Sequence, residues 1–337
     1  MKTRLMKELK IVFAAVMMCS LMAGCGTTSS KKATTVIIGT QEMPNDEGIA
    51  KAKKYFGKEL GVKVKYKKFD SGKDVATALM TEDIDFGLLG SCPAALTIAQ
   101  GAKVEYIWTH EVLGSVESLA VKSTIKSAAD LKGKKIATPF ASTAHYSLLK
   151  YLEENHISTK DVTLLDMQPA EIYTAWKSNQ ISAAYVWEPS LSKLTGATKL
   201  VTSGQMAKDG YMTANVELVT KSFAKTNPDL VKKYLKALNE SVALYKNDQR
   251  TAVKTIASSM DLSTKAASFQ MSGSTWLSAK EQIASSYMGT TSKKGAIVDN
   301  LYDIAKFLKD QKSITDVPSK VTFASAVNPS YAESIAK

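Results

Sequence analysis

From residue 35 onwards, short apolar segments alternate with segments whose apolar residues recur at helical spacing, and this alternation constrains the fold most. The predicted strands are residues 35–39, 62–66, 84–89, 104–108, 136–137, 162–165 and 183–186. The predicted helices include residues 48–60, 73–80, 301–308 and those that begin near 93, 143 and 228. This alternation predicts an α/β protein whose mainly parallel sheets carry helices on both faces. Roughly 310 residues remain after a leader, which exceeds one hydrophobic core, so two domains are expected.

Two of the predicted strands lead into helices through small hydroxyl or thiol residues. One junction lies in residues 84–96 and the other in residues 134–152. The residues at the two turns are Ser91, Cys92, Ser142 and Thr143. Because the first N–H groups of a helix have no partner within it, and the helix dipole is positive there, each junction predicts a seat for an anion. Two such seats in one chain are able to face each other across a cleft.

Further polar residues follow the predicted strands and belong on the same rim. In parallel sheets, ligands collect outside the carboxyl ends of the strands. That rule places Gln41, Glu42 and Asp70 on the rim that also carries Ser91 and Cys92. These rim positions follow from topology alone.

The first 25 residues have the pattern of an export signal. A basic start and a short apolar run describe a signal peptide at residues 1–24, and the run is too short for a transmembrane helix. Ala-Gly directly before Cys25 resembles a bacterial lipobox, in which the cysteine is lipidated and becomes the new N-terminus. A removed signal followed by an incidental cysteine is the alternative. Residues 25–33 are predicted to form a flexible tether. Because of the export signal and the lipobox-like residues, the protein is expected outside the cytoplasm, anchored to the membrane through a lipidated Cys25.

The chain is basic, with a formal net charge of +12 that falls to +9 once residues 1–24 are removed. These charges are scattered along helices without interleaved aromatic residues, so nucleic-acid binding is not expected. The excess of positive charge favours solubility, attraction to an anionic membrane surface and electrostatic steering of an anionic ligand.

Metal binding and catalysis are not expected from the few cysteines and histidines. The chain has three of each, and no pair has the spacing of a zinc site. Ser142 and His145 suggest a nucleophile and a base, but no strained turn or third partner accompanies them. A reactive thiolate at Cys92 would need a positioned base, so a non-catalytic cysteine is expected. No cofactor is predicted.

Six short segments, taken together, resemble one family. They are FDSG at 69–72, LGSCP at 89–93, ESLAVK at 117–122, TPFASTAHYSLL at 138–149, QPA at 168–170 and AYVW at 184–187. In this order they resemble the taurine-binding and aliphatic-sulfonate-binding proteins of ABC importers, over residues 35–280. The resemblance implies a type II periplasmic-binding-protein fold with two lobes and a two-strand hinge. Lobe 1 would comprise residues 34–120 and 218–337, and lobe 2 residues 121–217. It also implies a monomer that delivers a small organosulfonate to a permease and its ATPase.

If the ligand is such a sulfonate, the helix starts and the strand at 183–186 assign roles to particular residues. The sulfonate would be held by Ser91, Cys92, Ser142 and Thr143. Trp187, with Tyr185 on the same side of its strand, would supply an aromatic wall. The weaker ligand candidates are Gln41, Glu42 and Asp70, which rest on topology alone, and Glu117, His145 and Asn215.

The chain departs from the family pattern where the amine of taurine would bind. Asn215 stands where the relatives carry an acid, and Glu188 follows the Tyr-Val-Trp segment in place of a small residue. Either Glu188 meets the ammonium group, or the amine site is lost and the ligand is a plain alkanesulfonate. Glu117 is a further candidate acid, although a salt bridge at the hinge explains it nearly as well.

Other functions remain open from the sequence. Relatives that share the fold bind other small anions, such as nitrate, or a thiamine-pathway pyrimidine. An enzyme on the same two-lobe scaffold is a candidate from another class, and a surface adhesin without a ligand cleft is a third.

Overall fold

The computed structural model describes residues 32–336. The predicted signal at residues 1–24, the lipidation candidate Cys25 and nearly all of the predicted tether at residues 25–33 lie outside these described residues. From Ala33 onwards the chain forms one compact unit that contains two β-sheets. None of the helices in residues 32–336 is long and apolar enough to cross a membrane.

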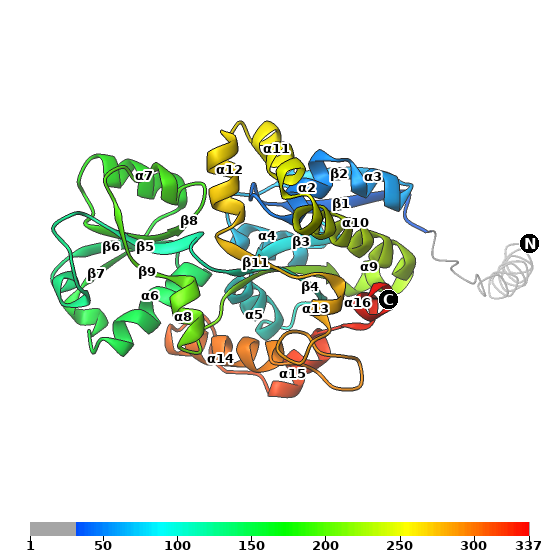
Figure 1. Cartoon of the computed structure of the whole chain (residues 1–337). Helices are drawn as coiled ribbons and strands as arrows, with labels where there is room; N and C mark the ends of the chain where they lie inside the picture. The colour runs from blue at the N-terminus through cyan, green and yellow to red at the C-terminus, as the bar shows by residue number, and fades with distance from the viewer. Residues whose placement is uncertain (1–31, 337) are drawn as a thin grey trace, which may run out of the picture. The chain divides into compact units, whose positions relative to one another are not determined.

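The larger sheet has six strands and the smaller sheet has five (Figure 1). In spatial order, the larger sheet consists of β11 (Ser274–Trp276), β4 (Val104–Leu113), β10 (Ala214–Thr220), β3 (Phe86–Gly90), β1 (Thr35–Thr40) and β2 (Lys63–Lys68). The smaller sheet consists of β7 (Thr163–Asp166), β6 (Lys135–Thr138), β8 (Ala183–Trp187), β5 (Glu117–Val121) and β9 (Thr198–Thr202).

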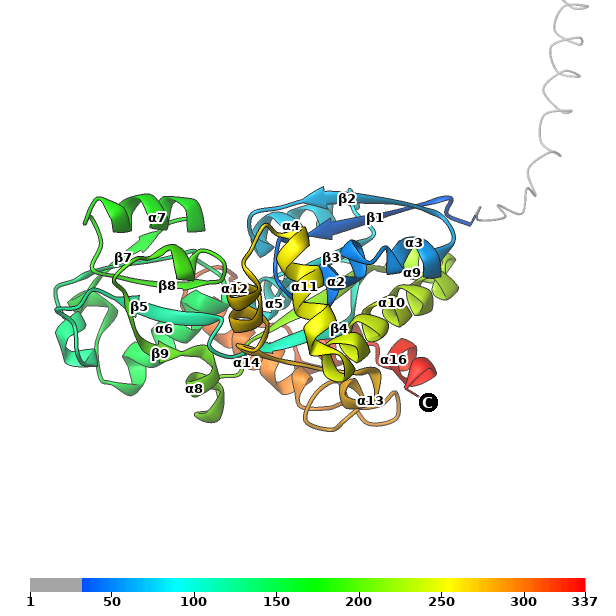
Figure 2. The ribbon, with the colours of Figure 1, turned by 45° about the horizontal axis from the view of Figure 1, so that its top comes forward.

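Most of the helices accompany the larger sheet. These are α2 (Asp46–Ala52), α3 (Tyr55–Leu60), α4 (Gly72–Met80), α5 (Ser91–Ala99), α9 (Lys221–Thr226), α10 (Pro228–Asn247), α11 (Gln249–Ser259), α12 (Thr264–Met271), α13 (Ala279–Gln282), α14 (Ile297–Asp310), α15 (Lys320–Ala326) and α16 (Ser330–Ile335). The smaller sheet lies with α6 (Thr143–Glu154), α7 (Pro169–Lys177), α8 (Ser203–Lys208) and the 3-10 turns Ala128–Leu131, Thr159–Asp161 and Leu191–Lys193. Figure 2 shows α6, α7 and the smaller sheet at one end of the compact unit. Around the larger sheet, α2, α10 and α11 pack together, and α5, α14 and α15 form a second group, in which α5 also contacts α6.

Most strands of each sheet run in one direction, as predicted, and each sheet also contains an antiparallel strand that follows a crossing. In the larger sheet β1, β2 and β3 run parallel, and β10 runs antiparallel to β3 and β4. In the smaller sheet β6, β7 and β8 run parallel, and β5 runs antiparallel to β8 and β9. The predicted α/β class is confirmed. The direction differs at β5 and β10 because these strands bring the chain in from the other sheet, and therefore begin at the edge where the parallel strands end.

The chain passes between the sheets twice, through residues 114–116 and through residues 203–213. These crossings lie a few residues before the predicted lobe boundaries at residues 120 and 217. Strand pairing groups β5 with the smaller sheet and β10 with the larger one. Strands of both sheets have the same apolar pattern, so the sequence does not show at which residue the chain crosses from one sheet to the other.

One predicted helix is divided in two. The segment 48–60 forms α2 and α3, and Lys54 between them adopts a left-handed φ of 59°. Ile49, Phe56 and Leu60 are all buried, so apolar spacing continues across the break. The pattern therefore predicts the buried face correctly and conceals the interruption.

Candidate functional site

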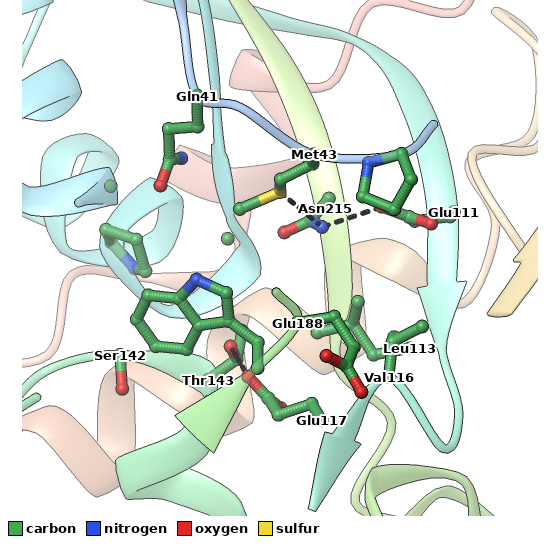
Figure 3. Close-up of a pocket in the computed structure, with 15 residues that line it drawn as sticks. Gln41, Met43, Glu111, Leu113, Val116, Glu117, Ser142, Thr143, Glu188 and Asn215 are labelled. Carbon is green, nitrogen blue, oxygen red and sulfur yellow. Dashed lines mark hydrogen bonds between the residues drawn. The ribbon is translucent and has the colours of Figure 1, made fainter. Parts of the chain in front are cut away.

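A pocket lies between the two sheets, where strands from both sheets end or begin (Figure 3). Its empty volume is about 540 Å³, open solvent included. The pocket-lining residues are Gln41, Met43, Pro44, Gly72, Gly90, Pro93, Glu111, Leu113, Val116, Glu117, Ser142, Thr143, Trp187, Glu188 and Asn215. Three of these described residues are glutamates, and none of them is lysine or arginine.

Three helices begin at the wall of the pocket. α4 begins at Gly72, α5 follows its N-cap Gly90, and α6 follows its N-cap Ser142. Within the described chain, no side chain caps α4 or α5 by a hydrogen bond, so N–H groups of their first turns stay available. The partial positive charge at a helix start adds to these donors. Together they favour an anion without any cationic side chain.

Glycine allows these helix starts to approach one another closely. A Cβ atom on Gly90 would lie 2.9 Å from Thr143 Cγ2, and one on Gly72 would lie 3.3 Å from Gly90 N. The first of these contacts is closer than carbon atoms tolerate, so a larger residue at position 90 would push the two lobes apart there. The absence of a side chain at Gly90 thus brings the start of α5 against the start of α6.

The hydroxyl groups of Ser142 and Thr143 already have protein partners. Ser142 Oγ donates to Pro139 O at 2.6 Å and accepts from His145 N at 3.1 Å. Thr143 Oγ1 donates to Glu117 Oε2 at 2.5 Å. Because a hydroxyl has only one proton to donate, an anion at this place would meet the backbone N–H groups of α6 rather than these hydroxyls.

Ser91 and Cys92, predicted to act beside them, are fully buried and do not line the pocket. Ser91 Oγ accepts a hydrogen bond from Ala214 N at 3.3 Å. Burial, and then the charge of Glu117, raise the pKa of the Cys92 thiol well above its ordinary value. Both side chains are buried away from the pocket, whereas the same turn reaches the pocket at Gly90.

Glu117 is a buried acid at the first residue of β5. Besides the bond from Thr143, its Oε1 accepts from Ser203 Oγ at 2.7 Å. Burial raises the pKa of Glu117 to about 7, and the hydrogen bonds from Thr143 and Ser203 limit that rise. The carboxyl group is therefore held by neighbours from the smaller lobe and titrates near neutrality.

Glu188, predicted to meet an ammonium group, lines the pocket and is 3% exposed. Its Oε1 accepts from Ser192 Oγ at 2.8 Å, and its Oε2 accepts from Ser192 N at 3.0 Å. Each carboxylate oxygen is thus bonded to the turn that follows β8.

Sequence reasoning missed Glu111, a buried acid that lines the same pocket. The strand was predicted to end at residue 108, whereas β4 continues to Leu113. Glu111 is paired across the sheet with Asn215, whose Nδ2 donates to Glu111 Oε1 at 2.9 Å. The apolar residues Val112 and Leu113 after Glu111 are the signal that would have extended the strand.

Neutral donors surround the Glu111 carboxylate. Besides Asn215, Asn45 Nδ2 donates to Oε1 at 3.4 Å, and Ser274 Oγ donates to Oε2. Burial raises the pKa of Glu111, and the bonds from Ser274 and Asn215 oppose that rise. The carboxylate is therefore fixed in place from three different segments of the chain.

A β-bulge and a buried polar network support this wall. Asn215 pairs with Glu111 but Val216 pairs with Thr109, which leaves His110 as the extra residue. His110 Nδ1 lies 2.7 Å from Asp46 Oδ1, and its Nε2 lies 3.0 Å from Glu217 Oε2; all three residues are fully buried. Burial lowers the pKa of His110, but the charges and hydrogen bonds of the two acids raise it well above its ordinary value. The network ties α2, β4 and β10 together directly behind Glu111.

The two predicted aromatic residues lie in different surroundings. Trp187, at the end of β8, is half-buried and lines the pocket. Tyr185, two residues earlier, is fully buried, and its hydroxyl lies 3.1 Å from Ser203 Oγ. The pocket thus has one aromatic wall from this strand.

The remaining rim candidates separate in the same way. Gln41 lines the pocket, and its Nε2 donates to Leu88 O at 3.0 Å. Glu42 and Asp70 are exposed and do not line it, and Glu42 forms an ion pair with Lys68 at 2.8 Å.

His145 is stacked on a neighbouring ring. Its centroid lies 4.4 Å from that of Phe140, and Ala141 N donates to its Nδ1 at 3.2 Å. Burial lowers the pKa of His145 to about 4, against a smaller opposing effect of Asp166. The ring nitrogen that accepts from Ala141 is not bonded to Ser142. Within residues 32–336, no group of three or more His, Cys, Asp or Glu residues is arranged to hold a metal ion.

Two sheets joined by two crossings, with a pocket at strand ends and helix starts between them, define a two-lobe binding-protein fold. A family model described as NMT1/THI5 like matches residues 48–252. The chain is 32% identical to the taurine-binding periplasmic protein of Escherichia coli (strain K12), over 85% of this chain and 89% of the relative. It is 30% identical to a putative aliphatic sulfonates-binding protein of Bacillus subtilis (strain 168), over 77% of this chain and 80% of the relative. The chain belongs to the NMT1/THI5-like family, and the predicted resemblance is confirmed.

Solved structures agree with the two-lobe fold. The alkanesulfonate-binding protein SsuA from Xanthomonas axonopodis pv. citri, bound to MOPS, matches with a TM-score of 0.70 and 24% identity, over 88% of this chain and 99% of that one. The desulfurization enzyme DSZB matches with a TM-score of 0.65 and 17% identity, over 90% of this chain and 98% of that one. Because binding proteins and an enzyme share the scaffold, function has to be argued from the pocket.

Proposed function

We propose that this protein captures taurine or a related alkanesulfonate in the pocket between its lobes and delivers it to an ABC permease. The observation that carries the proposal is the convergence of three helix starts, at Gly72, Gly90 and Ser142, on a pocket whose described wall has no lysine or arginine. A sulfonate stays ionised across the working pH range, and backbone N–H groups with helix dipoles hold such an anion. The relatives named for taurine and for aliphatic sulfonates support the same ligand class.

In this proposal the backbone contributes most of the sulfonate contacts. The N–H groups at the start of α5, which reaches the pocket at Gly90, and those of α6, at Thr143 and beyond, donate to the sulfonate oxygens. Trp187 covers the carbon chain of the ligand. Lobe closure about the two crossings encloses the ligand, and the closed form docks on the permease, whose ATPase drives transport.

We propose that the protein acts as a monomer outside the cytoplasm, anchored through a lipidated Cys25. The lipobox-like residues before Cys25 support this placement, as does the periplasmic location named for the Escherichia coli relative. Mass spectrometry of the membrane fraction would detect the diacylated N-terminal peptide, and finding Cys25 unmodified would contradict the anchor.

We further propose that the protein captures its ligand without altering it. A nucleophile needs a base within hydrogen-bond reach, and the ring nitrogen of His145 accepts from Ala141, not from Ser142. The thiol of Cys92 is fully buried, with a raised pKa. Incubation with the ligand, followed by mass spectrometry of the small molecule, should recover it unchanged. Turnover in the absence of a permease would favour the enzyme alternative.

Calorimetric titration of the chain truncated after Cys25 tests the ligand class. Taurine, ethanesulfonate, nitrate and an aminopyrimidine are titrated separately in Tris chloride buffer, because sulfonic-acid and phosphate buffers would compete for the pocket. Micromolar or tighter binding of a sulfonate, with nitrate and the pyrimidine at least about 100-fold weaker, is expected. Binding of neither sulfonate would contradict the proposal.

A further inference from the structure

The charge of the pocket wall does not suit a ligand that is only an anion. Glu111, Glu117 and Glu188 line the pocket, and none of the described lining residues carries a positive side-chain charge. A sulfonate alone brings a further negative charge into this desolvated space. A ligand that also carries a cation removes that conflict, provided the cation lies against an acid that has no cation of its own.

The three glutamates differ in how their charges are already met. Glu117 accepts a hydrogen bond from Thr143 at the positively polarised start of α6, and burial raises the pKa of Glu117 to about 7. Glu188 accepts hydrogen bonds from Ser192 through both oxygens, and its charge acts to raise the pKa of Lys199. The hydrogen bonds to the Glu111 carboxylate come only from the neutral donors described above. The neighbouring His110 is bonded to two other acids, Asp46 and Glu217, and not to Glu111. Of the three, Glu111 is the acid best placed to receive a cation from the ligand.

Asn215 supplies a second acceptor beside Glu111. One amide hydrogen of Asn215 is directed to Glu111 Oε1 at 2.9 Å and the other to Met43 Sδ at 3.3 Å. A flipped amide would set its oxygen against the carboxylate, so Nδ2 has to be the atom that faces Glu111. Among the described residues Oδ1 has no hydrogen-bond donor, and it lies on the pocket side of the side chain in Figure 3.

The strand register sets the distance between the two ends of the pocket. Asn215 pairs with Gly90 on one side and with Glu111 on the other. Two strand spacings place Gly90 and Glu111 about 10 Å apart. That distance suits a short zwitterion with one hydrogen bond at each end, of about 3 Å each. In Figure 3, Ser142 and Thr143 lie on one side of the pocket, and Glu111 and Asn215 lie on the other.

We infer that the pocket selects aminoalkanesulfonates over plain alkanesulfonates, and that Glu111, with Asn215 Oδ1, binds the ligand's ammonium group. The inference rests on the proposed function and deepens it by naming the substrate class. It assigns the specificity to Glu111 on β4 in place of Glu188, the acid favoured from the sequence.

The test compares two matched substitutions, Glu111→Gln and Glu188→Gln, with two ligands, taurine and ethanesulfonate. Calorimetric dissociation constants are measured for each pair in Tris chloride buffer. Wild type should bind taurine at least about 30-fold more tightly than ethanesulfonate, because only taurine completes a buried charge pair. Glu111→Gln should weaken taurine binding by about 100-fold and change ethanesulfonate binding by less than about threefold. Glu188→Gln should keep the wild-type preference.

The outcomes separate this inference from the proposed function. Equal binding of both ligands by wild type would overturn the inference and leave sulfonate capture intact, whereas binding of neither ligand would overturn both. Loss of the taurine preference in Glu188→Gln, but not in Glu111→Gln, would assign the ammonium to Glu188. Glu111→Asp guards against a folding defect, since it keeps the charge and should retain a preference for taurine. If both Glu111 variants lost both ligands, Glu111 would be a structural residue and the inference would fail.

Discussion

The starts of α5 and α6 come from the same sequence pattern, yet they present different atoms to the pocket. In α5 the N-cap is Gly90, and the hydroxyl of Ser91 belongs to the first helical residue. In α6 the hydroxyl of Ser142 is itself the N-cap. One residue of offset turns the side chains by about 100° about the helix axis. The hydroxyl and thiol of α5 therefore enter the core, whereas the side chains at the start of α6 reach the pocket wall.

The largest expected effect tests whether α5 depends on having no side chain at its N-cap. Gly90→Val should weaken sulfonate binding by more than about 100-fold, because overpacking of a tight contact costs about 1–3 kcal/mol or more and separates the two helix starts. Gly57→Val is the matched control, since a Cβ at Gly57 meets nothing within 4 Å. Calorimetry on both variants measures the effect. A Gly90→Val protein that bound normally would show that the close approach is not needed.

The next effect concerns pH, because the start of α6 is bonded to a titrating acid. The folded-state pKa of Glu117, about 7, exceeds its ordinary value of 4.5, so the folded state binds more protons than the unfolded state between these pH values. The free energy of unfolding should therefore fall as pH rises from about 4.5 to about 7, by on the order of 3 kcal/mol at most from this group. Urea unfolding at several pH values should show a shallower fall in Glu117→Gln.

The pH profile of Glu117→Gln has to be compared with that of wild type, because a second acid, Glu47, titrates in a neighbouring pH range. Burial, and then the charge of Glu217, raise the pKa of Glu47 to about 8, which extends the fall in stability to higher pH in both proteins. Identical pH profiles for wild type and Glu117→Gln would show that Glu117 does not titrate in this range.

A smaller effect distinguishes the hydroxyl of Thr143 from its backbone. Thr143→Val keeps the shape but removes a donor to buried Glu117, so the free energy of unfolding should fall by about 1–3 kcal/mol. Sulfonate affinity should change by less than about threefold, because backbone N–H groups meet the anion. Denaturant unfolding and calorimetry measure the two quantities. A loss of affinity with unchanged stability would mean that the hydroxyl itself contacts the ligand.

The smallest effect is expected at Cys92. Because the thiol is fully buried and its pKa is raised, it should stay unreactive towards a thiol-specific disulfide reagent in the native protein and react after unfolding in urea. Cys92→Ala should leave ligand affinity within about twofold, since the side chain does not line the pocket. Rapid labelling of the native protein would place the start of α5 closer to solvent than the fold described above.

Sequence reasoning predicted the elements that depend on local pattern. Strand and helix alternation gave the α/β class, and the helix starts near 93 and 143 were located because turn and cap residues act over a few neighbouring positions. The double crossing came from the family resemblance. The break at Lys54 was not predicted, since buried residues keep their spacing on both sides of it.

The pocket wall was harder to predict, because it depends on pairing between distant strands. Glu111 and Asn215 are 104 residues apart in sequence and meet only through the β4–β10 register. Sequence position also could not show that the hydroxyls of Ser142 and Thr143 donate to protein groups. Local pattern thus located helix starts, whereas the atoms that face the ligand depend on register and on one residue of helical offset.

The double crossing has a consequence for the order in which the protein folds. The smaller sheet is built from the continuous stretch between residues 117 and 202, whereas adjacent strands β4 and β10 of the larger sheet flank that whole stretch. Bringing β10 beside β4 closes a long loop, and distant pairings of this kind form slowly. We expect amides of β6 and β8 to gain protection before those of β10 during refolding. Pulse-labelling hydrogen exchange on the full chain measures this order, and simultaneous protection would contradict it. In a chain that emerges from an export channel with its N-terminus first, the smaller lobe would then form before β10 completes the larger sheet.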